Sequence, residues 1–376
     1  MTELQDILNG HMDGFLRTHR VSSQQMKVMR AIVNCRTAVL GAHIDKCDEC
    51  GYEHISYNSC RNRHCPKCQT FAKEEWLEKQ KHNLLDIQYF HTVFTVPDEL
   101  NVVFLSNQNA MYGLLFKAVS ETVLELCADK KHLGATPGIT AVLHTWGQAL
   151  NYHLHLHCVI TGGGLSDADS WERSSKKFFL PIKVLSKKFR GKFLYYLRRA
   201  KLAFHGSAQH LNDSLNYSEF IKSLYKKDWV VYCKPPFGNA QKVIEYLGRY
   251  THRIAISNNR IKNLENGMVS FQWRDYSDGN KTKLMTLAAD EFIRPFLLHV
   301  LPSGFRKIRH FGIFASRDKT KRLALCKKLT KTVIKVTNVL NQTATEKLIG
   351  IFGIDFNLCP KCNHGHLSRA SPFAAN

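Results

Sequence analysis

The sequence predicts an α+β fold, and three features of its 376 residues predict it. Residues 1–45 place apolar side chains at helical spacing, among them Leu4, Ile7 and Leu8. Residues 47–68 hold five cysteines, four of them in Cys-x2-Cys pairs. From about residue 86, strand-like segments rich in aromatic and β-branched residues alternate with helix-like segments. We therefore expect a helical, cysteine-rich domain over 1–85, a mixed domain over 86–315 and a basic helical tail over 316–376.

The first half of the chain passes from helices to strands. Spacing and residue type predict, in order, a polar helix over Phe71–Leu85, a strand over Gln88–Val96, helix over 98–131, and strands over Ile139–Trp146 and His153–Thr161. Pro97 ends the first of these strands, and we expect Gly162–Gly164 to end the last.

The second half of the chain is expected to form shorter helices and strands. We expect a strand over Trp229–Cys233, a helix over Ala240–Tyr250, a hairpin of Ile254–Ile261 with Val269–Arg274, and a helix over 284–300. Asn266-Gly267 predicts the hairpin turn, because both residues tolerate a positive φ. Residues 174–201 hold ten Lys and Arg, no acid and six aromatics, a mixture typical of surfaces that bind a single nucleic-acid strand.

The charge of the chain indicates its class of partner. It carries 53 Lys and Arg against 31 Asp and Glu, a formal charge of +22. Such an excess predicts an anionic polymer, nucleic acid first. An acidic membrane surface is the alternative, but no amphipathic anchor or lipidation motif supports it. No apolar run of about 18 residues occurs, and the N-terminus has no export-signal pattern, so we expect a cytoplasmic protein.

The cysteine pairs predict zinc. A Cys-x2-Cys turn offers two thiolates to one Zn²⁺, and in a reducing compartment this spacing favours metal over disulfides. The favoured ligand set comprises the two pairs closest in sequence, Cys47, Cys50, Cys65 and Cys68. Cys60 and His64 are further candidates. Basic residues surround the second pair and predict phosphate contacts, so this module is expected to bind DNA through Arg61, Arg63 and Lys67.

A third pair lies near the C-terminus. Cys359 and Cys362 have the same spacing and form half of a zinc site. His364 and His366 follow closely, so either histidine completes the site, or ligands come from elsewhere in the chain. The alternative is a tail that binds no metal.

Alternating histidines mark one predicted strand. Since successive side chains of a strand point to opposite faces, His153, His155 and His157 share a face, about 6–7 Å from one to the next. Imidazoles so placed can hold one metal ion together. The apolar run that follows His157 favours His155 and His157 over the register that uses His153 and His155.

Two tyrosines share a face of a predicted helix. Tyr246 and Tyr250 are four residues apart, which brings their hydroxyls to the same side. Beside a metal that polarises phosphate, a tyrosine can attack the phosphate and keep the bond energy in a phosphotyrosine. Two such residues allow two successive strand transfers.

These residues carry a resemblance to a known family. His155-Leu156-His157 and Tyr246-x3-Tyr250 resemble the HUH (His-hydrophobic-His) nucleases that use two tyrosines. The surrounding motifs narrow the resemblance to rolling-circle transposases of the insertion-sequence-91 type, over about residues 40–315: Tyr57–Gln69, His144–Gly147, Tyr246–Arg253 and Arg309–Gly312. The family implies an antiparallel sheet flanked by helices, preceded by a zinc-binding domain.

The resemblance also implies a reaction. Such enzymes nick single-stranded DNA at the ends of their element, form a 5′-phosphotyrosine and free a 3′-hydroxyl. By position, His155 and His157 match the metal pair and Tyr246 and Tyr250 the nucleophiles. A third ligand is usual in these sites, and His153, His144 and Gln148 are the candidates.

The metal and the DNA contacts follow from this chemistry. Mg²⁺ or Mn²⁺ suits a phosphoryl site completed by oxygens and water, while histidines alone suit zinc equally well. Arg249 and Arg253 flank the tyrosines and are expected to clamp the scissile phosphate. The chain has no phosphate-binding loop of the GxxxxGK[ST] type, so strand displacement requires a host helicase and replication machinery.

Two other functions remain open from the sequence. A zinc-dependent DNA-binding regulator without catalysis explains the charge and the cysteines but not the histidines and tyrosines. A replication initiator or relaxase shares the chemistry, but the cysteine-rich module in front of the mixed domain favours the transposase.

Overall fold

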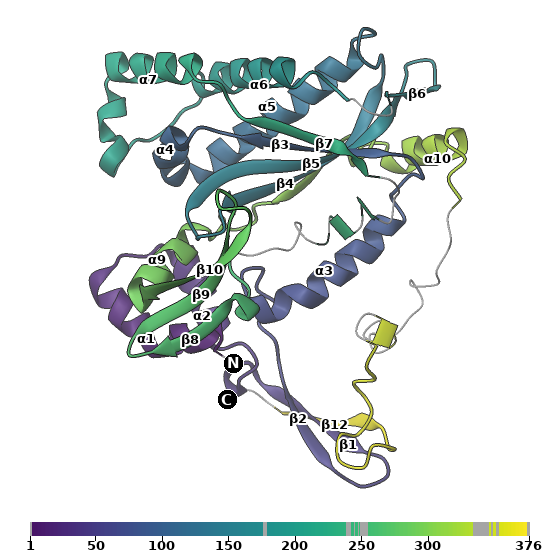
Figure 1. The fold of residues 1–376 in the computed structure, drawn as a ribbon. Helices are drawn as coiled ribbons and strands as arrows, with labels where there is room; N and C mark the ends of the chain where they lie inside the picture. The colour runs from purple at the N-terminus through teal and green to yellow at the C-terminus, as the bar shows by residue number, and fades with distance from the viewer. Residues whose placement is uncertain are drawn as a thin grey trace. The chain divides into compact units, whose positions relative to one another are not determined.

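The computed structural model divides the chain into two compact units. Unit 1 comprises 1–79, 252–300 and 334–376, and unit 2 comprises 80–251 and 301–333. The structure describes residues 2–175, 179–237, 255–333 and 353–373, and the single positions 242, 243, 245, 246, 248, 346, 349 and 350 (Figure 1). Unit 1 therefore draws on both ends of the chain and on a middle segment that the sequence alone assigned to the mixed domain.

Unit 2 is built on one antiparallel sheet. Its strands are ordered β11-β4-β5-β3-β7, and β6 pairs with the end of β5. Their bounds are β3 Tyr89–Thr95, β4 Thr136–Trp146, β5 Tyr152–Leu165, β6 Trp171–Arg173, β7 Val231–Phe237 and β11 Ile308–Gly312. The strands expected from Gln88, Ile139, His153 and Trp229 are therefore confirmed within a few residues.

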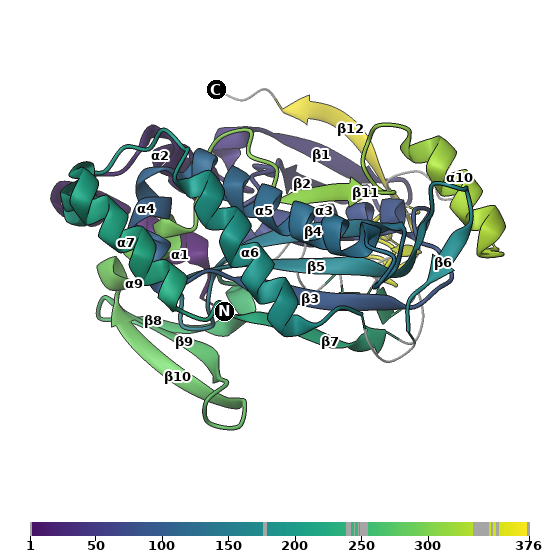
Figure 2. The ribbon, with the colours of Figure 1, turned by 90° about the horizontal axis from the view of Figure 1, so that it is seen from above.

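Helices cover one face of this sheet (Figures 1 and 2). They are α4 Asn101–Ser106, α5 Gln108–Ala128, α6 Ile182–Leu197 and α7 Ser214–Lys226, with the 3₁₀ turns Asp98–Leu100 and Gly206–Asn212. Alternate residues of β3, β4 and β5, such as Phe94, Leu143 and Leu156, pack against them and form the core. The intervening residues face away from these helices, and the histidines are among them.

Part of the aromatic content of residues 174–201 belongs to the core. Phe189 and Phe193 of α6 are fully buried and Phe179 is nearly so, whereas Tyr195 is exposed. Lys188 and Lys192 form ion pairs with Glu125, so two of the cations are neutralised within the unit. An amphipathic helix that packs on a sheet combines buried aromatic residues with basic residues on its other side, so this composition also has a structural explanation, and the nucleic-acid surface stays a prediction.

The glycine run does not end β5, contrary to expectation. Gly162, Gly163 and Gly164 continue the strand to Leu165. A Cβ at Gly163 would lie 2.5 Å from the carbonyl oxygen of Glu172, and one at Gly164 would lie 2.7 Å from that of Thr136. The glycines therefore allow the backbones of β6 and β4 to approach closely.

Unit 1 contains the N-terminal helices and a three-stranded meander. The helices α1 Leu4–Thr18 and α2 Ser23–Val33 begin the chain, as predicted, and α9 Ala289–Leu298 follows the meander β8 Ile261–Glu265, β9 Met268–Asp275 and β10 Lys281–Ala288. Asn266 and Gly267 form the predicted turn with φ of 49° and 74°. The hairpin strand expected over Ile254–Ile261 lies at Ile261–Glu265 instead, after the 3₁₀ turn Asn258–Arg260, while the strand expected over Val269–Arg274 is confirmed within β9. In the helix expected over 284–300, residues 284–288 are strand instead, because they belong to β10, which pairs with β9 along its whole length.

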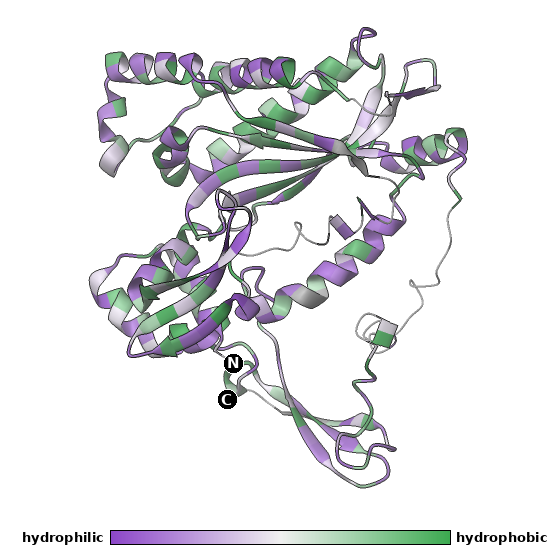
Figure 3. Cartoon of the chain, viewed as in Figure 1, coloured by the Kyte–Doolittle hydropathy of each residue, from purple (hydrophilic) through white to green (hydrophobic). Residues whose placement is uncertain are grey.

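A second small sheet joins the two ends of the chain in unit 1. Its order is β12-β1-β2, with β1 Ala42–Cys47, β2 Glu53–Tyr57 and β12 Leu367–Phe373, after a 3₁₀ turn at Ala38–Leu40. The helix α3 Pro66–Lys81 starts five residues before its predicted position and is mostly hydrophilic (Figure 3). In the tail, α10 spans Lys319–Leu329. Within the described residues no helix combines the length and apolar character that a membrane span requires.

Candidate functional site

Three histidines meet on the sheet face of unit 2 that faces away from α5 and α6. His144 lies opposite His155 in the pairing of β4 with β5, and His157 is two residues further along β5. One ring nitrogen from each histidine lies within 4.8 Å of those of the other two, and the Nε2 atoms of His155 and His157 are 3.1 Å apart. The three imidazoles can therefore hold one metal ion.

Strand alternation and register produce this cluster. The face opposite the histidines is apolar and packs on α5 and α6, so the odd-numbered positions of β5 carry the polar groups. Of the two histidine candidates for a third ligand, His144 is in the cluster and His153 is not, while Gln148 stays a candidate. The Nδ1 atom of His153 lies 3.7 Å from a carboxylate oxygen of Asp98 instead.

Tyr246 lies against this cluster. Its side chain is 8% exposed, and its hydroxyl lies 3.1 Å from Nδ1 of His157. The hydroxyl also contacts Nε2 of His91, a buried residue of β3. Lys242, Val243, Glu245, Tyr246 and Gly248 are helical, as expected for this segment, whereas Tyr250, Arg249 and Arg253 lie outside the described residues.

His91 links the tyrosine to the cluster of His144, His155 and His157, and sequence analysis did not single it out. Its Nε2 atom lies 3.1 Å from Nδ1 of His157. Burial lowers the pKa of His91 to about 3, with Lys234 and His155 contributing, so the ring is neutral at pH 7. A single histidine in an apolar strand carries no periodic signal, and only the pairing of β3 with β5 brings it here.

The cysteines form two clusters, which differ from the single set favoured by sequence proximity. Cys65 and Cys68 group with Cys35 and Cys60, and Cys47 and Cys50 group with Cys359 and Cys362. In the first cluster, the Sγ atom of Cys68 lies 3.6 Å from those of Cys35 and Cys60, and Cys65 and Cys35 are 3.7 Å apart. Four thiolates around Zn²⁺ with bonds of about 2.3 Å are about 3.8 Å apart, so this cluster fits zinc.

Backbone geometry explains the regrouping. Cys35 follows α2 and lies beside the turn that begins at Cys60, whose backbone N–H donates to Cys35 Sγ at 3.5 Å. The pairing of β1 with β12 directs Cys47 toward the C-terminal segment instead. His64 is buried but is not among the ligand candidates, and neither His364 nor His366 joins the second cluster. Cys35 was missed because it is an isolated cysteine in a helical context.

The basic residues predicted to contact DNA have different environments. Arg61 is exposed, with φ of 50°, and burial lowers the pKa of the partly buried Arg63. Lys67 forms an ion pair with Glu3 at 2.6 Å. Arg61 is therefore the most accessible of the three.

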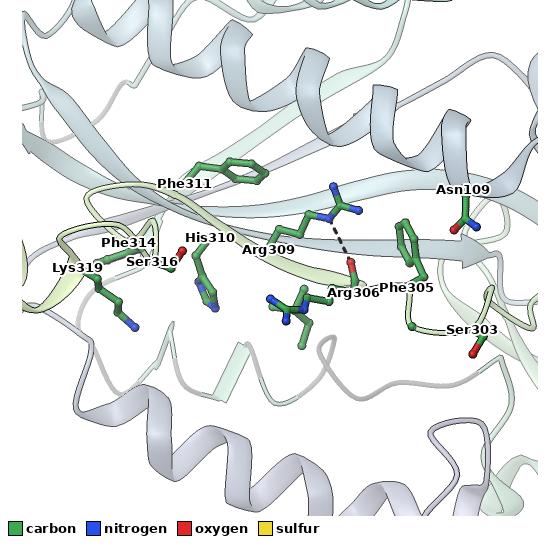
Figure 4. A pocket seen from close by; sticks show the side chains of 12 residues that line it. Asn109, Ser303, Phe305, Arg306, Arg309, His310, Phe311, Phe314, Ser316 and Lys319 are labelled. Atoms are coloured by element: carbon green, nitrogen blue, oxygen red, sulfur yellow. Dashed lines mark hydrogen bonds between the residues drawn. The ribbon is translucent and has the colours of Figure 1, made fainter. Parts of the chain in front are cut away.

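A basic pocket lies beside β11 in unit 2 (Figure 4). Arg306, Arg309, His310 and Lys319 line it together with aromatic side chains and Asn109, and none of its lining residues in the described part of the chain is acidic. Nδ1 of His310 lies 3.1 Å from the hydroxyl of Thr140, and burial, with Lys319, lowers the pKa of His310 to about 4.

Comparisons with known proteins identify the family of the chain. A family model described as "Transposase zinc-binding domain" matches residues 7–96, and one described as "Putative transposase" matches 138–322. The chain is 43% identical over 373 residues to the "Putative transposase y4qJ" of Sinorhizobium fredii, which covers 97% of this chain and 94% of that protein. It is 26% identical over 303 residues to the transposase for insertion sequence element IS801 of Pseudomonas savastanoi, covering 78% and 71%. No solved structure matches the chain.

Proposed function

Because this chain belongs to the transposases of the insertion-sequence-91 type, with their N-terminal zinc-binding domain, we propose that it nicks single-stranded DNA at element ends and transfers strands by a rolling-circle route. As a transposase it is a DNA-processing enzyme, and DNA is its partner. The proposed intermediate is a 5′-phosphotyrosine. The cluster of His144, His155 and His157 beside the hydroxyl of Tyr246 is the observation that carries this proposal.

The histidine cluster fits a divalent ion at a phosphoryl site. Three nitrogen donors leave coordination positions for water and phosphate oxygens, as a catalytic site requires. When bound, Mg²⁺ or Mn²⁺ would polarise the scissile phosphate and stabilise its developing charge. The Nε2 atoms of His155 and His157 are 3.1 Å apart, and with both bound to one ion His157 would carry its proton on Nδ1.

The tyrosine supplies the nucleophile. The oxygen of Tyr246 forms the new bond to phosphorus, the bond from phosphorus to the 3′ oxygen breaks, and the 3′ oxygen takes up a proton to become a hydroxyl. The tyrosine loses its own proton in the same step, so protons balance. Neutral His91 can accept a hydrogen bond from this hydroxyl at Nε2 and so aims the oxygen. Tyr250 is proposed as the second nucleophile.

The remaining parts of the proposal concern DNA. Arg249 and Arg253 would clamp the phosphate, and Arg61 and Arg63 would contact DNA near the zinc-binding domain. Displacement of the nicked strand would depend on a host helicase and replication machinery, at the nucleoid of a bacterial cytoplasm.

A nicking assay tests the proposal. Labelled single-stranded DNA spanning an element end is incubated with Mn²⁺ and the wild type, His144→Ala, His155→Ala or His157→Ala. We expect each of the three substitutions to abolish nicking while DNA binding persists. His153→Ala is the matched control, because His153 shares the strand and the face but is not in the cluster. Nicking that survives all three substitutions would overturn the assignment.

A further inference from the structure

The C-terminal segment, which lies outside both family matches, completes a four-thiolate cluster. The zinc-binding match ends at residue 96 and the transposase match at residue 322. Cys359 and Cys362 come after both, yet each lies within hydrogen-bonding distance of a cysteine from the N-terminal domain.

Strand pairing brings the two ends together. β12 runs antiparallel to β1, from the pair Ala42 and Phe373 to the pair Cys47 and Leu367. Beyond the strands, the N–H of Asp48 donates to the carbonyl oxygen of His366 at 3.1 Å. The two Cys-x2-Cys turns are therefore held face to face at the end of a three-stranded sheet, the arrangement of a zinc ribbon.

Sulfur geometry matches a tetrahedral ion. The Sγ atoms of Cys47 and Cys362 are 3.7 Å apart, and those of Cys50 and Cys359 are 3.6 Å apart. These separations are close to the sulfur–sulfur distance of about 3.8 Å expected for four thiolates around Zn²⁺. They far exceed the S–S bond length of a disulfide, about 2.05 Å.

The surrounding backbone is adapted to thiolates. The N–H of Cys50 donates to Cys47 Sγ at 3.5 Å, and that of Gly365 donates to Cys362 Sγ at 3.3 Å. Such donors stabilise negative charge on sulfur. A Cβ at Gly365 would lie 2.5 Å from Cys47 Sγ, so a glycine leaves the room that the sulfur needs.

We propose that Cys47, Cys50, Cys359 and Cys362 bind a second structural Zn²⁺, which makes residues 353–373 an integral part of the zinc-binding unit. The other cluster is complete without them, so the chain holds two independent zinc sites. Four thiolates fill the coordination sphere, and the site is therefore structural rather than catalytic.

Zinc content of the purified full chain tests the proposal. We expect Cys359→Ser/Cys362→Ser to hold one equivalent less than the wild type, and the control Cys233→Ser to hold as much as the wild type, since Cys233 belongs to neither cluster. Equal zinc content in the double variant and the wild type would overturn the proposal.

Differential alkylation of the wild type decides the matter if the double variant does not fold. Cys50 is exposed and alkylates readily unless metal protects it. We expect Cys50, Cys359 and Cys362 to react together, and only after chelation. Reaction of Cys50 in the zinc-loaded protein at the rate of the half-buried Cys233 would contradict the proposal.

A second inference concerns the basic pocket beside β11. The N–H of Leu143 donates to the carbonyl oxygen of Lys307 at 2.9 Å, so the antiparallel register places Arg306 level with His144. His310 bonds to Thr140, which shares its sheet face with His144. Figure 4 shows Arg306, His310 and Lys319 on one side of β11, with Arg309 and Phe311 on the other.

We infer that a single DNA strand runs along β11 from the histidine cluster, with its phosphates on Arg306 and Lys319. This inference rests on the proposed nicking activity and adds the path of the substrate. The two cations line the pocket on the side of β11 where His310 lies, and they have no acidic neighbour among the residues that line the pocket. The phosphate backbone of a single DNA strand suits two cations placed in this way.

Binding of labelled oligo(dT) without divalent metal tests this path. Arg306→Ala/Lys319→Ala should weaken binding about tenfold and reduce the salt slope by about 1.4, because each lost phosphate contact contributes about 0.7 on a single strand. Arg317→Ala, an exposed neighbour that does not line the pocket, should change affinity less than about twofold.

The outcomes separate the two proposals. Unchanged affinity and slope in the double variant would overturn the path, even if the wild type nicks DNA. A wild type that binds through these residues but never nicks would overturn the proposed function and leave the path standing.

Discussion

Replacing His91 by phenylalanine should impair the metal site without disturbing DNA binding. The substitution keeps a ring of similar size in a position that is 2% exposed, and it removes the nitrogen that contacts both His157 and Tyr246. Loss of the hydrogen-bond partner of a metal-binding histidine typically lowers metal affinity or activity 10- to 100-fold, which corresponds to about 1.4–2.7 kcal/mol. The hydrogen bond that the Tyr246 hydroxyl donates to His91 Nε2 contributes about 0.5–1.5 kcal/mol, which is of similar size.

The assay has two parts. Calorimetric titration with Mn²⁺ measures metal affinity, and steady-state nicking separates kcat from KM. We expect weaker Mn²⁺ binding and a lower kcat with KM for DNA unchanged, because His91 is buried beneath the tyrosine. His153→Phe is the control and should leave both values within about twofold. Equal Mn²⁺ affinity and kcat in His91→Phe and wild type would refute the reasoning.

Two further predictions concern the strand beside the site. Gly312 has φ of 62°, and a Cβ there would lie 1.8 Å from the carbonyl oxygen of Pro137, so Gly312→Ala should lower the free energy of unfolding by about 2 kcal/mol or more in urea titrations. Gly191→Ala, on helix α6 with open space around it, should be neutral or stabilising, and equal effects of the two changes would contradict this account. His310 has its pKa lowered to about 4, so the unfolded state takes up its proton first as the pH falls below about 6.5. The wild type should therefore lose about 2 kcal/mol more stability than His310→Gln between pH 7 and pH 5, and parallel losses would show that His310 is not responsible.

Local patterns predict much of unit 2, because its strands alternate cleanly. His155 and His157 could be chosen from the sequence, since the face opposite them is apolar throughout. The choice of His144 over His153 depends on the pairing of β4 with β5, which no local pattern encodes. His91 depends on the pairing of β3 with β5 for the same reason.

Long-range pairing also explains the cysteines. Sequence proximity favours Cys47 and Cys50 with Cys65 and Cys68, but β12 returns from the other end of the chain to pair with β1. Each Cys-x2-Cys spacing identifies half a site, and the fold chooses the partner. The prediction that Gly162–Gly164 end β5 failed for a different reason, since glycine is typical both of the end of a strand and of a close approach between two backbones.

The most direct test of the central claim is to map the covalent bond between protein and DNA. Wild type is incubated with single-stranded DNA spanning an element end and Mn²⁺, digested with protease and nuclease, and analysed by mass spectrometry. The account predicts a nucleotide phosphate on the peptide that contains Tyr246 or Tyr250, and no adduct when both are replaced by phenylalanine. Nicking without any phosphotyrosine, or an adduct that persists in the double variant, would contradict it.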